Sequence, residues 1–148
     1  MNYADALAEM LHDGTDSLWR TVSSTPDEKL QWHPGPDTRT ARELLEELVM
    51  TTGYSRQLLE LQKDPGMAGA ADDSDKTIEE LEKLHRESIE KYIDAVKAFP
   101  EDKLHEKITL PWGEMTFLQV IYYPYWNLVY HWGQISFIQT MYGDKQMY

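Results

Sequence analysis

Four polar side chains fall on helical faces that are otherwise apolar, and their types could support chemistry. Asn127, His131 and Gln134 follow one another at helical spacing in the last apolar segment. Residues four apart project from one face of a helix, so Asn127 and His131 could share one metal ion. Glu47 lies in a stripe of Leu and Tyr residues. A buried carboxylate is costly unless it is paired, hydrogen-bonded or bound to a metal, so one of these partners is expected.

Residue composition limits this chemistry. The chain has no cysteine and five histidines, which excludes disulfides, thiolate nucleophiles and cysteine-based metal sites. His33 lies in a Trp-His-Pro sequence and is expected to pack in a turn. His85 falls at the edge of an apolar stripe, where a solvated side chain is expected. His12 and His105 belong to no constellation, and no nucleophile–base pair or glycine-rich phosphate loop is present in the sequence.

Four long helices must position these side chains. Apolar periodicity places them at residues 3–22, 41–62, 78–99 and 117–142. Three helix starts carry a capping box, in which a Thr caps the helix and a Glu or Gln reaches back: Thr40 with Glu43, Thr77 with Glu80, and Thr116 with Gln119. A fourth box, Thr25 with Glu28, is expected to open only a short turn. Gly143 is expected as the left-handed cap of the last helix.

The connections between these helices predict the fold class. Residues 23–39 and 63–75 form long connections, and the latter are expected to form a mobile loop. Residues 107–116 alternate apolar and polar side chains around Pro111-Trp-Gly113, which predicts a hairpin or an extended crossover. Long connections favour an all-α four-helix bundle with crossovers over a simple up-and-down array. We expect one domain that spans residues 1–148.

Charge and composition exclude several classes of partner. The chain has 148 residues and a formal net charge of −12, which opposes binding to nucleic acids and to anionic membranes. No long uncharged apolar run predicts a transmembrane helix, and the first residues do not resemble a signal peptide. These features, with the lack of cysteine, are typical of a cytoplasmic protein.

Aromatic residues concentrate in and near the last helix: Trp112, Trp126 and Trp132, with Tyr122, Tyr123, Tyr125 and Tyr130. This helix is apolar almost all round, so it is expected to be buried on more than one side. A core combined with a homodimer interface through this helix is expected. The alternative is the wall of a small-molecule pocket. Gly14 interrupts the stripe of the first helix and indicates either a cavity or close helix packing.

The motifs of this chain resemble those of the DinB/YfiT-like family of four-helix bundles. The resemblance covers residues 25–34, 40–48, 110–117 and 127–134, and continues at Tyr142-Gly-Asp144. The family pattern His-x-x-x-His-x-Gly-Gln appears here as Asn127-Leu-Val-Tyr-His131-Trp-Gly-Gln134. His131, Gly133 and Gln134 are kept, Asn127 replaces the first His, and Glu47 stands where the family usually carries another His.

This resemblance implies a divalent metal, nickel or zinc, held in the family by three His. Here the corresponding ligands would be Glu47, Asn127 and His131, with Gln134 orienting His131. Such a metal acts as a Lewis acid on a bound thiol or water, which implies a thiol S-transferase or a hydrolase. However, an amide oxygen is a weak ligand for nickel or zinc. The alternative is a non-catalytic, metal-free bundle that binds a small molecule or is associated with stress, with Glu47, His131, Asn127 and Gln134 in a hydrogen-bonded network.

Overall fold

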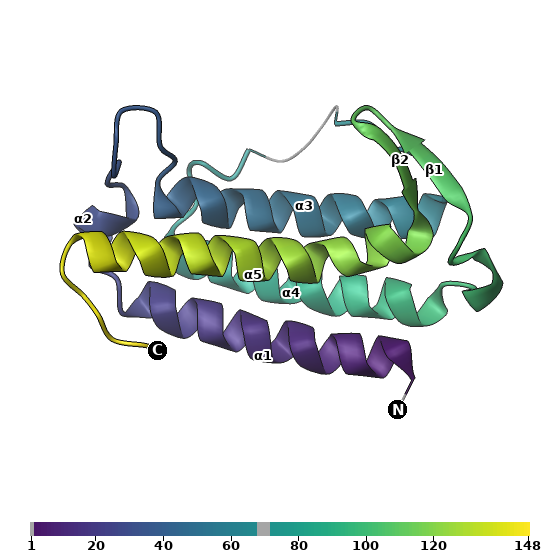
Figure 1. Cartoon of the computed structure of the whole chain (residues 1–148), viewed down its shortest axis with the longest axis horizontal. Coiled ribbons are helices and arrows are strands. Elements are labelled where there is room, and N and C mark those ends of the chain that lie inside the picture. Colours follow the sequence, from purple (N-terminus) through teal and green to yellow (C-terminus); the bar gives the residue numbers. More distant parts are fainter. Residues whose placement is uncertain (1, 68–71) are drawn as a thin grey trace.

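The structure is a computed structural model that describes residues 2–67 and 72–148. Within these residues the chain forms four long helices and a hairpin (Figure 1). The long helices are α1 (Tyr3–Ser23), α3 (Ala41–Leu61), α4 (Ile78–Ala98) and α5 (Phe117–Met141). The short elements are α2 (Asp27–Leu30), η1 (Glu101–Lys103), β1 (Lys107–Leu110) and β2 (Gly113–Thr116). The predicted all-α bundle with a hairpin before its last long helix is confirmed.

Local sequence signals set the helix ends. The capping boxes at Thr40, Thr77 and Thr116 are all formed, with the Thr hydroxyl accepting from the third backbone N–H and the Glu or Gln returning to the cap. Gly143 has a φ of 98° and closes α5 as predicted. The box predicted at Thr25 is wrong: α2 has no side-chain cap, and the Thr25 hydroxyl instead donates to the Thr21 carbonyl.

The four long helices pack so that each contacts two others. α3 lies against α4 and α5, and α1 lies against the same two helices (Figure 1). Gly14 of α1 is buried against α5, because a Cβ there would lie 2.9 Å from Leu128 Cδ2. The structure therefore bears out the close-packing alternative for Gly14.

The hairpin covers one end of the α3–α5 pair. β1 and β2 are antiparallel, with Ile108 opposite Met115, and β2 leads directly into α5 (Figure 1). Trp112 in the turn packs against Tyr54 of α3, with ring centroids 5.8 Å apart. Met67 of the predicted loop 63–75 lies near the hairpin, and residues 68–71 of that loop lie outside the described part of the chain. This arrangement leaves a hollow between α3, α5 and the hairpin.

The structure corrects the prediction for His85. Its side chain is not solvated but 1% exposed, in the core between α1 and α4. Trp19 of α1 donates its indole N–H to His85 Nδ1 at 3.0 Å. Among the described residues, no helix combines the length and apolar character needed to span a membrane.

Candidate functional site

The predicted residues Glu47 and His131 meet across the contact between α3 and α5. His131 is 2% exposed, and its Nε2 lies 3.2 Å from Glu47 Oε1. An ionised carboxylate has no proton to donate, so Nε2 is the donor. The other ring nitrogen, Nδ1, lies 2.6 Å from Gln134 Oε1, one helical turn further along α5. Both nitrogens of His131 are therefore engaged, and Gln134 orients the ring.

Arg39 supplies a cation to this cluster and was not foreseen from the sequence. It precedes the N-cap of α3, and its side chain extends along the first two turns of that helix. Its guanidinium donates to the Glu43 carbonyl at 3.3 Å and forms an ion pair with Glu47 Oε2. Glu47 thus contacts an arginine through one oxygen and His131 through the other. We call Arg39, Glu47, His131 and Gln134 the polar cluster.

The electrostatics of Glu47 follow from these contacts. Partial burial raises the pKa of Glu47, but hydrogen bonds from Arg39 and His131, together with their charges, outweigh burial and hold the pKa below its ordinary value. The carboxylate is therefore ionised at neutral pH. A partly buried carboxylate that is paired with a guanidinium and an imidazole needs no further cation to be stable.

Asn127 lies beside the polar cluster but bonds elsewhere. Its amide nitrogen donates to Thr51 Oγ1 at 2.9 Å, and the Thr51 hydroxyl donates to the Glu47 backbone carbonyl at 2.8 Å. The hydroxyl has only one proton, which fixes the direction of both bonds. Asn127 therefore reaches Glu47 only through Thr51 and its backbone, not through the carboxylate.

These contacts do not fit a nickel or zinc site. A metal between Glu47 and His131 would have to break their contact and would lie beside the guanidinium of Arg39, which already neutralises the carboxylate. Asn127 turns its amide nitrogen, which is no metal ligand, toward Thr51. Within residues 2–67 and 72–148, no three His, Asp or Glu side chains come together in a way that could hold a metal ion.

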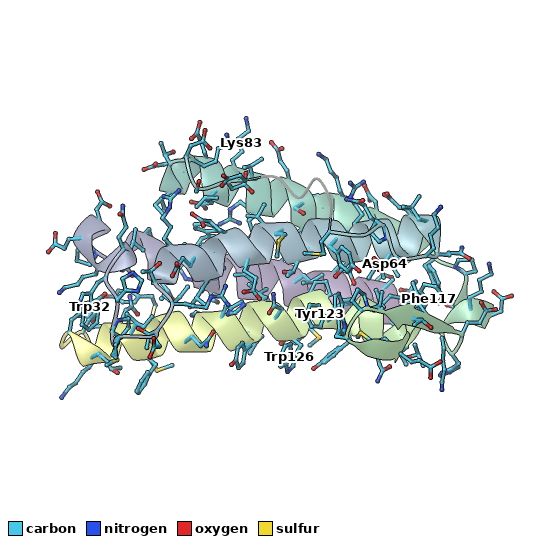
Figure 2. The ribbon with its side chains drawn as sticks, turned by 90° about the horizontal axis from the view of Figure 1, so that it is seen from above. Trp32, Asp64, Lys83, Phe117, Tyr123 and Trp126 are labelled. Atoms are coloured by element: carbon cyan, nitrogen blue, oxygen red, sulfur yellow. The ribbon has the colours of Figure 1, made fainter. Side chains whose placement is uncertain are left out.

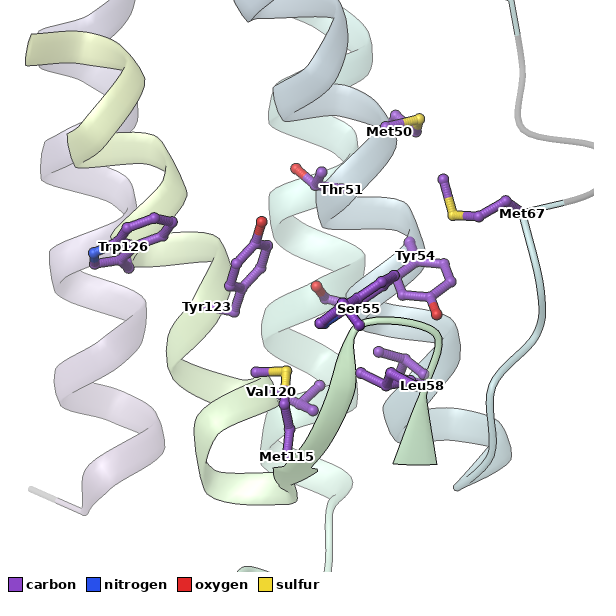
Figure 3. Close-up of a pocket in the computed structure, with 12 residues that line it drawn as sticks. Met50, Thr51, Tyr54, Ser55, Leu58, Met67, Met115, Val120, Tyr123 and Trp126 are labelled. Atoms are coloured by element: carbon purple, nitrogen blue, oxygen red, sulfur yellow. The ribbon is translucent and has the colours of Figure 1, made fainter. Parts of the chain in front are cut away.

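An apolar cavity of about 400 Å³ opens beside Thr51, between α3, α5 and the hairpin (Figure 3). We call it the hairpin cavity. Aromatic and Met side chains make up most of its wall: Met50, Tyr54, Met67, Trp112, Met115, Tyr123 and Trp126. Figure 3 shows Tyr123 of α5 directed toward α3. Met115 of the hairpin lies below Tyr123 in this view, and Met67 lies at the right, beyond α3. A cavity of this size and lining suits a small, largely apolar molecule.

Two hydroxyls in the wall of the hairpin cavity are already committed as donors. The Tyr54 hydroxyl donates to Asp64 at 2.6 Å, and burial and this acceptor raise the pKa of Tyr54 well above its ordinary value. Burial and the nearby charge of Glu47 raise the pKa of Tyr123. Thr51 donates to a backbone carbonyl, as described above. The ionised Asp64 carboxylate beside Tyr54 disfavours an anion in the cavity.

A second, more polar hollow of about 650 Å³ lies on the other side of the polar cluster. Arg39 and Thr38 contribute to it from the connection before α3, and Gln134 and Phe137 contribute from α5. The polar cluster therefore lies between two hollows, with Thr51 and Tyr123 facing one and Arg39 and Gln134 facing the other. We call the second one the loop hollow.

Comparison with known proteins agrees with this fold. The sequence profile of the DinB superfamily matches residues 10–135. The chain belongs to the DinB superfamily. The crystal structure of a DinB-like protein from Bacillus subtilis, YjoA, superposes on it with a TM-score of 0.76 over 97% of this chain and 96% of that chain. The identity is 11%, so this likeness concerns the fold alone. No curated protein matches the chain in sequence.

Proposed function

We propose that this DinB-superfamily protein binds a neutral, planar and largely apolar molecule in the hairpin cavity, without a metal. The observation that carries the proposal is the wall of that cavity, which is built from aromatic rings and methionines around about 400 Å³ of space. Aromatic faces select flat ligands, and flexible Met side chains adapt to their outline. The polar cluster closes the adjacent space and holds α3 and α5 together.

Charge and hydrogen bonding narrow the class of ligand. Glu47 and Asp64 stand close to the cavity, and the whole chain carries a net charge of −12. Tyr54 and Thr51 have each committed their hydroxyl proton to an acceptor within the protein. These hydroxyls can offer lone pairs but not protons. We therefore infer that the ligand can donate an N–H or O–H to Tyr54 or Thr51 and carries no negative charge.

The contacts of the polar cluster support this metal-free function over a metal-dependent thiol S-transferase or hydrolase. Either enzyme would need Glu47 and His131 as open ligands. In this chain Glu47 is paired with Arg39, and both nitrogens of His131 have oxygen partners. A satisfied hydrogen-bonded cluster of this kind rigidifies the contact between two helices. It fits a scaffold for binding better than an open coordination site.

A matched pair of fluorescent probes tests the proposal. N-phenyl-1-naphthylamine is neutral and planar and has one N–H, and 8-anilinonaphthalene-1-sulfonate has the same skeleton with a sulfonate. We expect one molecule of the neutral probe per chain, bound at least about tenfold more tightly than the sulfonate, which corresponds to about 1.4 kcal/mol. Equal affinities, or no saturable binding of the neutral probe, would contradict the proposal.

Variants locate the bound probe. Ser55 is 2% exposed and lines the hairpin cavity, so Ser55→Phe should fill the cavity and remove binding of the neutral probe. Trp112→Ala removes an exposed part of the wall and should weaken binding without disturbing the core. Met10→Ser is the matched control, because Met10 of α1 is 40% exposed and lines neither hollow. Loss of binding in Met10→Ser, with binding kept in Ser55→Phe, would place the probe outside the cavity.

A further inference from the structure

One face of α5 is apolar and turned away from the bundle. Seven large side chains on it are between 40% and 65% exposed: Leu118, Tyr122, Trp126, Val129, Tyr130, Phe137 and Met141. Their spacing of three and four residues places them along a single side of the helix. Figure 2 shows Trp126 on the side of α5 away from α3, whereas Tyr123 lies between the two helices. We call these seven residues the outer face of α5.

Charge sets this face apart from the rest of the surface. No Asp, Glu, Lys or Arg occurs among the residues of α5, whereas the chain as a whole has 26 acidic and 14 basic residues. Two copies of a chain with a net charge of −12 repel one another over most of their surfaces. The outer face of α5 is a surface over which two copies can meet without placing like charges together.

Gly133 gives a second, independent indication of a contact. It is exposed on the outer face of α5, and a Cβ built on it would have no described atom within 4 Å. Nothing in the described part of the chain therefore requires a glycine there, although glycine is unfavourable inside a helix. Gly14 differs, because Leu128 leaves no room for its Cβ. A glycine in the middle of an apolar helix face lets another helix approach closely.

The size of the outer face suits a dimer. With 150–250 Å² for a large side chain, the seven half-exposed residues offer roughly 700 Å² of apolar surface per chain. A standard interface buries about 800 Å² on each partner, and the largest apolar patch of a typical monomer covers about 300–600 Å². The face is therefore larger than a monomer usually leaves in water. Its five residues within about two turns of Gly133, from Trp126 to Met141, can contribute roughly 500 Å² per chain to a twofold contact there.

We propose that the outer face of α5 binds a second copy of this chain across a twofold axis near Gly133. A twofold contact pairs one patch with itself, so an uncharged aromatic patch satisfies it without complementary charges. A charged partner would find no opposite charge on α5. An antiparallel crossing at Gly133 brings Tyr130 of each copy against Phe137 of the other.

This dimer also changes the surroundings of the polar cluster. Tyr130, Phe137 and Met141 belong both to the outer face of α5 and to the wall of the loop hollow. A second copy seated on them forms the missing wall of that hollow. Arg39, whose side chain is 48% exposed in the single chain, then becomes shielded together with its pair to Glu47. Trp126 belongs both to the outer face of α5 and to the wall of the hairpin cavity, but the inference rests on α5 and not on the ligand proposed for that cavity.

Sedimentation velocity on the full chain tests the association. We expect a dimer at micromolar concentration. Phe137→Asp should weaken the dimer at least about a hundredfold, and Gly133→Ala about tenfold, with folding unimpaired by circular dichroism. Met10→Asp is the matched control, since Met10 of α1 is 40% exposed and lies on a different helix. A wild-type chain that is still monomeric at about 100 µM would overturn the proposal. A dimer that survives Phe137→Asp would overturn it as well.

The lack of native cysteine allows a direct test of the geometry. In Gly133→Cys the only thiols of a dimer are the two introduced ones. A twofold axis near Gly133 brings their Cα atoms within the roughly 4.4–6.8 Å that a disulfide requires. Mild oxidation should therefore cross-link Gly133→Cys and leave the exposed control Gln57→Cys uncross-linked. A dimer whose Gly133→Cys variant does not cross-link, or cross-links no faster than Gln57→Cys, would contradict the axis proposed here.

Discussion

Two buried histidines in this molecule have opposite surroundings. His131, on α5, contacts an ionised carboxylate with one nitrogen and Gln134 with the other. His85, on α4, accepts one hydrogen bond from Trp19, and its Nε2 has no partner among the described residues. Burial, with a further contribution from the charge of Arg86, lowers the pKa of His85 to about 4. One histidine belongs to a polar cluster, and the other is a neutral part of the core.

The space around each histidine differs in the same way. His131 lies between the hairpin cavity and the loop hollow, whereas His85 is packed with Trp19 where α1 meets α4, their ring centroids 6.0 Å apart. Both are almost completely buried, at 2% and 1% exposure. Burial of a histidine is therefore no sign of a site by itself. The charged partners and adjoining hollows distinguish the candidate site from the core.

The two histidines should differ most in how they make the free energy of unfolding depend on pH. The unfolded chain binds a proton at residue 85 below about pH 6.5, but the folded chain does so only near pH 4. The unfolded state thus holds more protons in this window, and the free energy of unfolding should fall by about 3 kcal/mol as pH drops through it. His85→Gln keeps an acceptor for Trp19 but does not titrate. Urea unfolding between pH 4 and 7 should show a flatter slope for this variant, and an unchanged slope would refute the assignment.

Removing the carboxylate of the polar cluster should have the next largest effect. Glu47→Leu leaves the buried Nε2 of His131 without its acceptor, which should cost about 1–3 kcal/mol at neutral pH. The folded pKa of Glu47 lies below its ordinary value, so the contribution of this carboxylate is present above that value and disappears as pH falls through the folded pKa. Glu60→Leu, which breaks an exposed pair with Arg56, is the control and should change stability by less than about 1 kcal/mol. Equal losses in both variants would show that Glu47 is only a surface group.

Arg39→Ala should have the smallest effect on stability. The Arg39 side chain is 48% exposed, and pairs of this kind contribute less than about 1 kcal/mol. The variant should nevertheless raise the pKa of Glu47, because it removes the hydrogen bond and the charge that oppose partial burial. NMR titration of the Glu47 carboxyl carbon measures this shift, with Arg20→Ala as a control. An unchanged pKa of Glu47 would show that His131 alone stabilises the carboxylate.

The fold was predictable because its signals are local. Each confirmed capping box involves residues three apart, and the helix ends lie within one residue of the predicted ones. The exception is Thr25, whose hydroxyl turns to Thr21 and also accepts from Gln139 of α5 at 3.0 Å. The hydrogen bond between Gln139 and Thr25, 114 residues apart, overrides the local capping-box pattern. The periodicity of the sequence contains no information about such a contact.

The candidate site was predictable only in part for the same reason. Glu47 and His131 were conspicuous because they interrupt apolar stripes, and they do meet. Arg39 lies in an irregular connection, where no period indicates the direction of a side chain. The need of a buried carboxylate for a cation was the one signal that pointed to a nearby arginine. His85 was misplaced because its burial depends on Trp19, 66 residues away.

The central claim is that Glu47 and His131 are closed to a metal by their own partners. Calorimetric titration with nickel and zinc, together with elemental analysis, tests this most directly. A variant with both Arg39→Ala and Asn127→His serves as the positive control, because it frees the carboxylate and supplies a second imidazole. We predict less than about a tenth of an equivalent bound by the wild-type chain, with no shift in Tm, and binding gained in the double variant. About one equivalent bound by the wild-type chain and lost in His131→Ala would contradict the account.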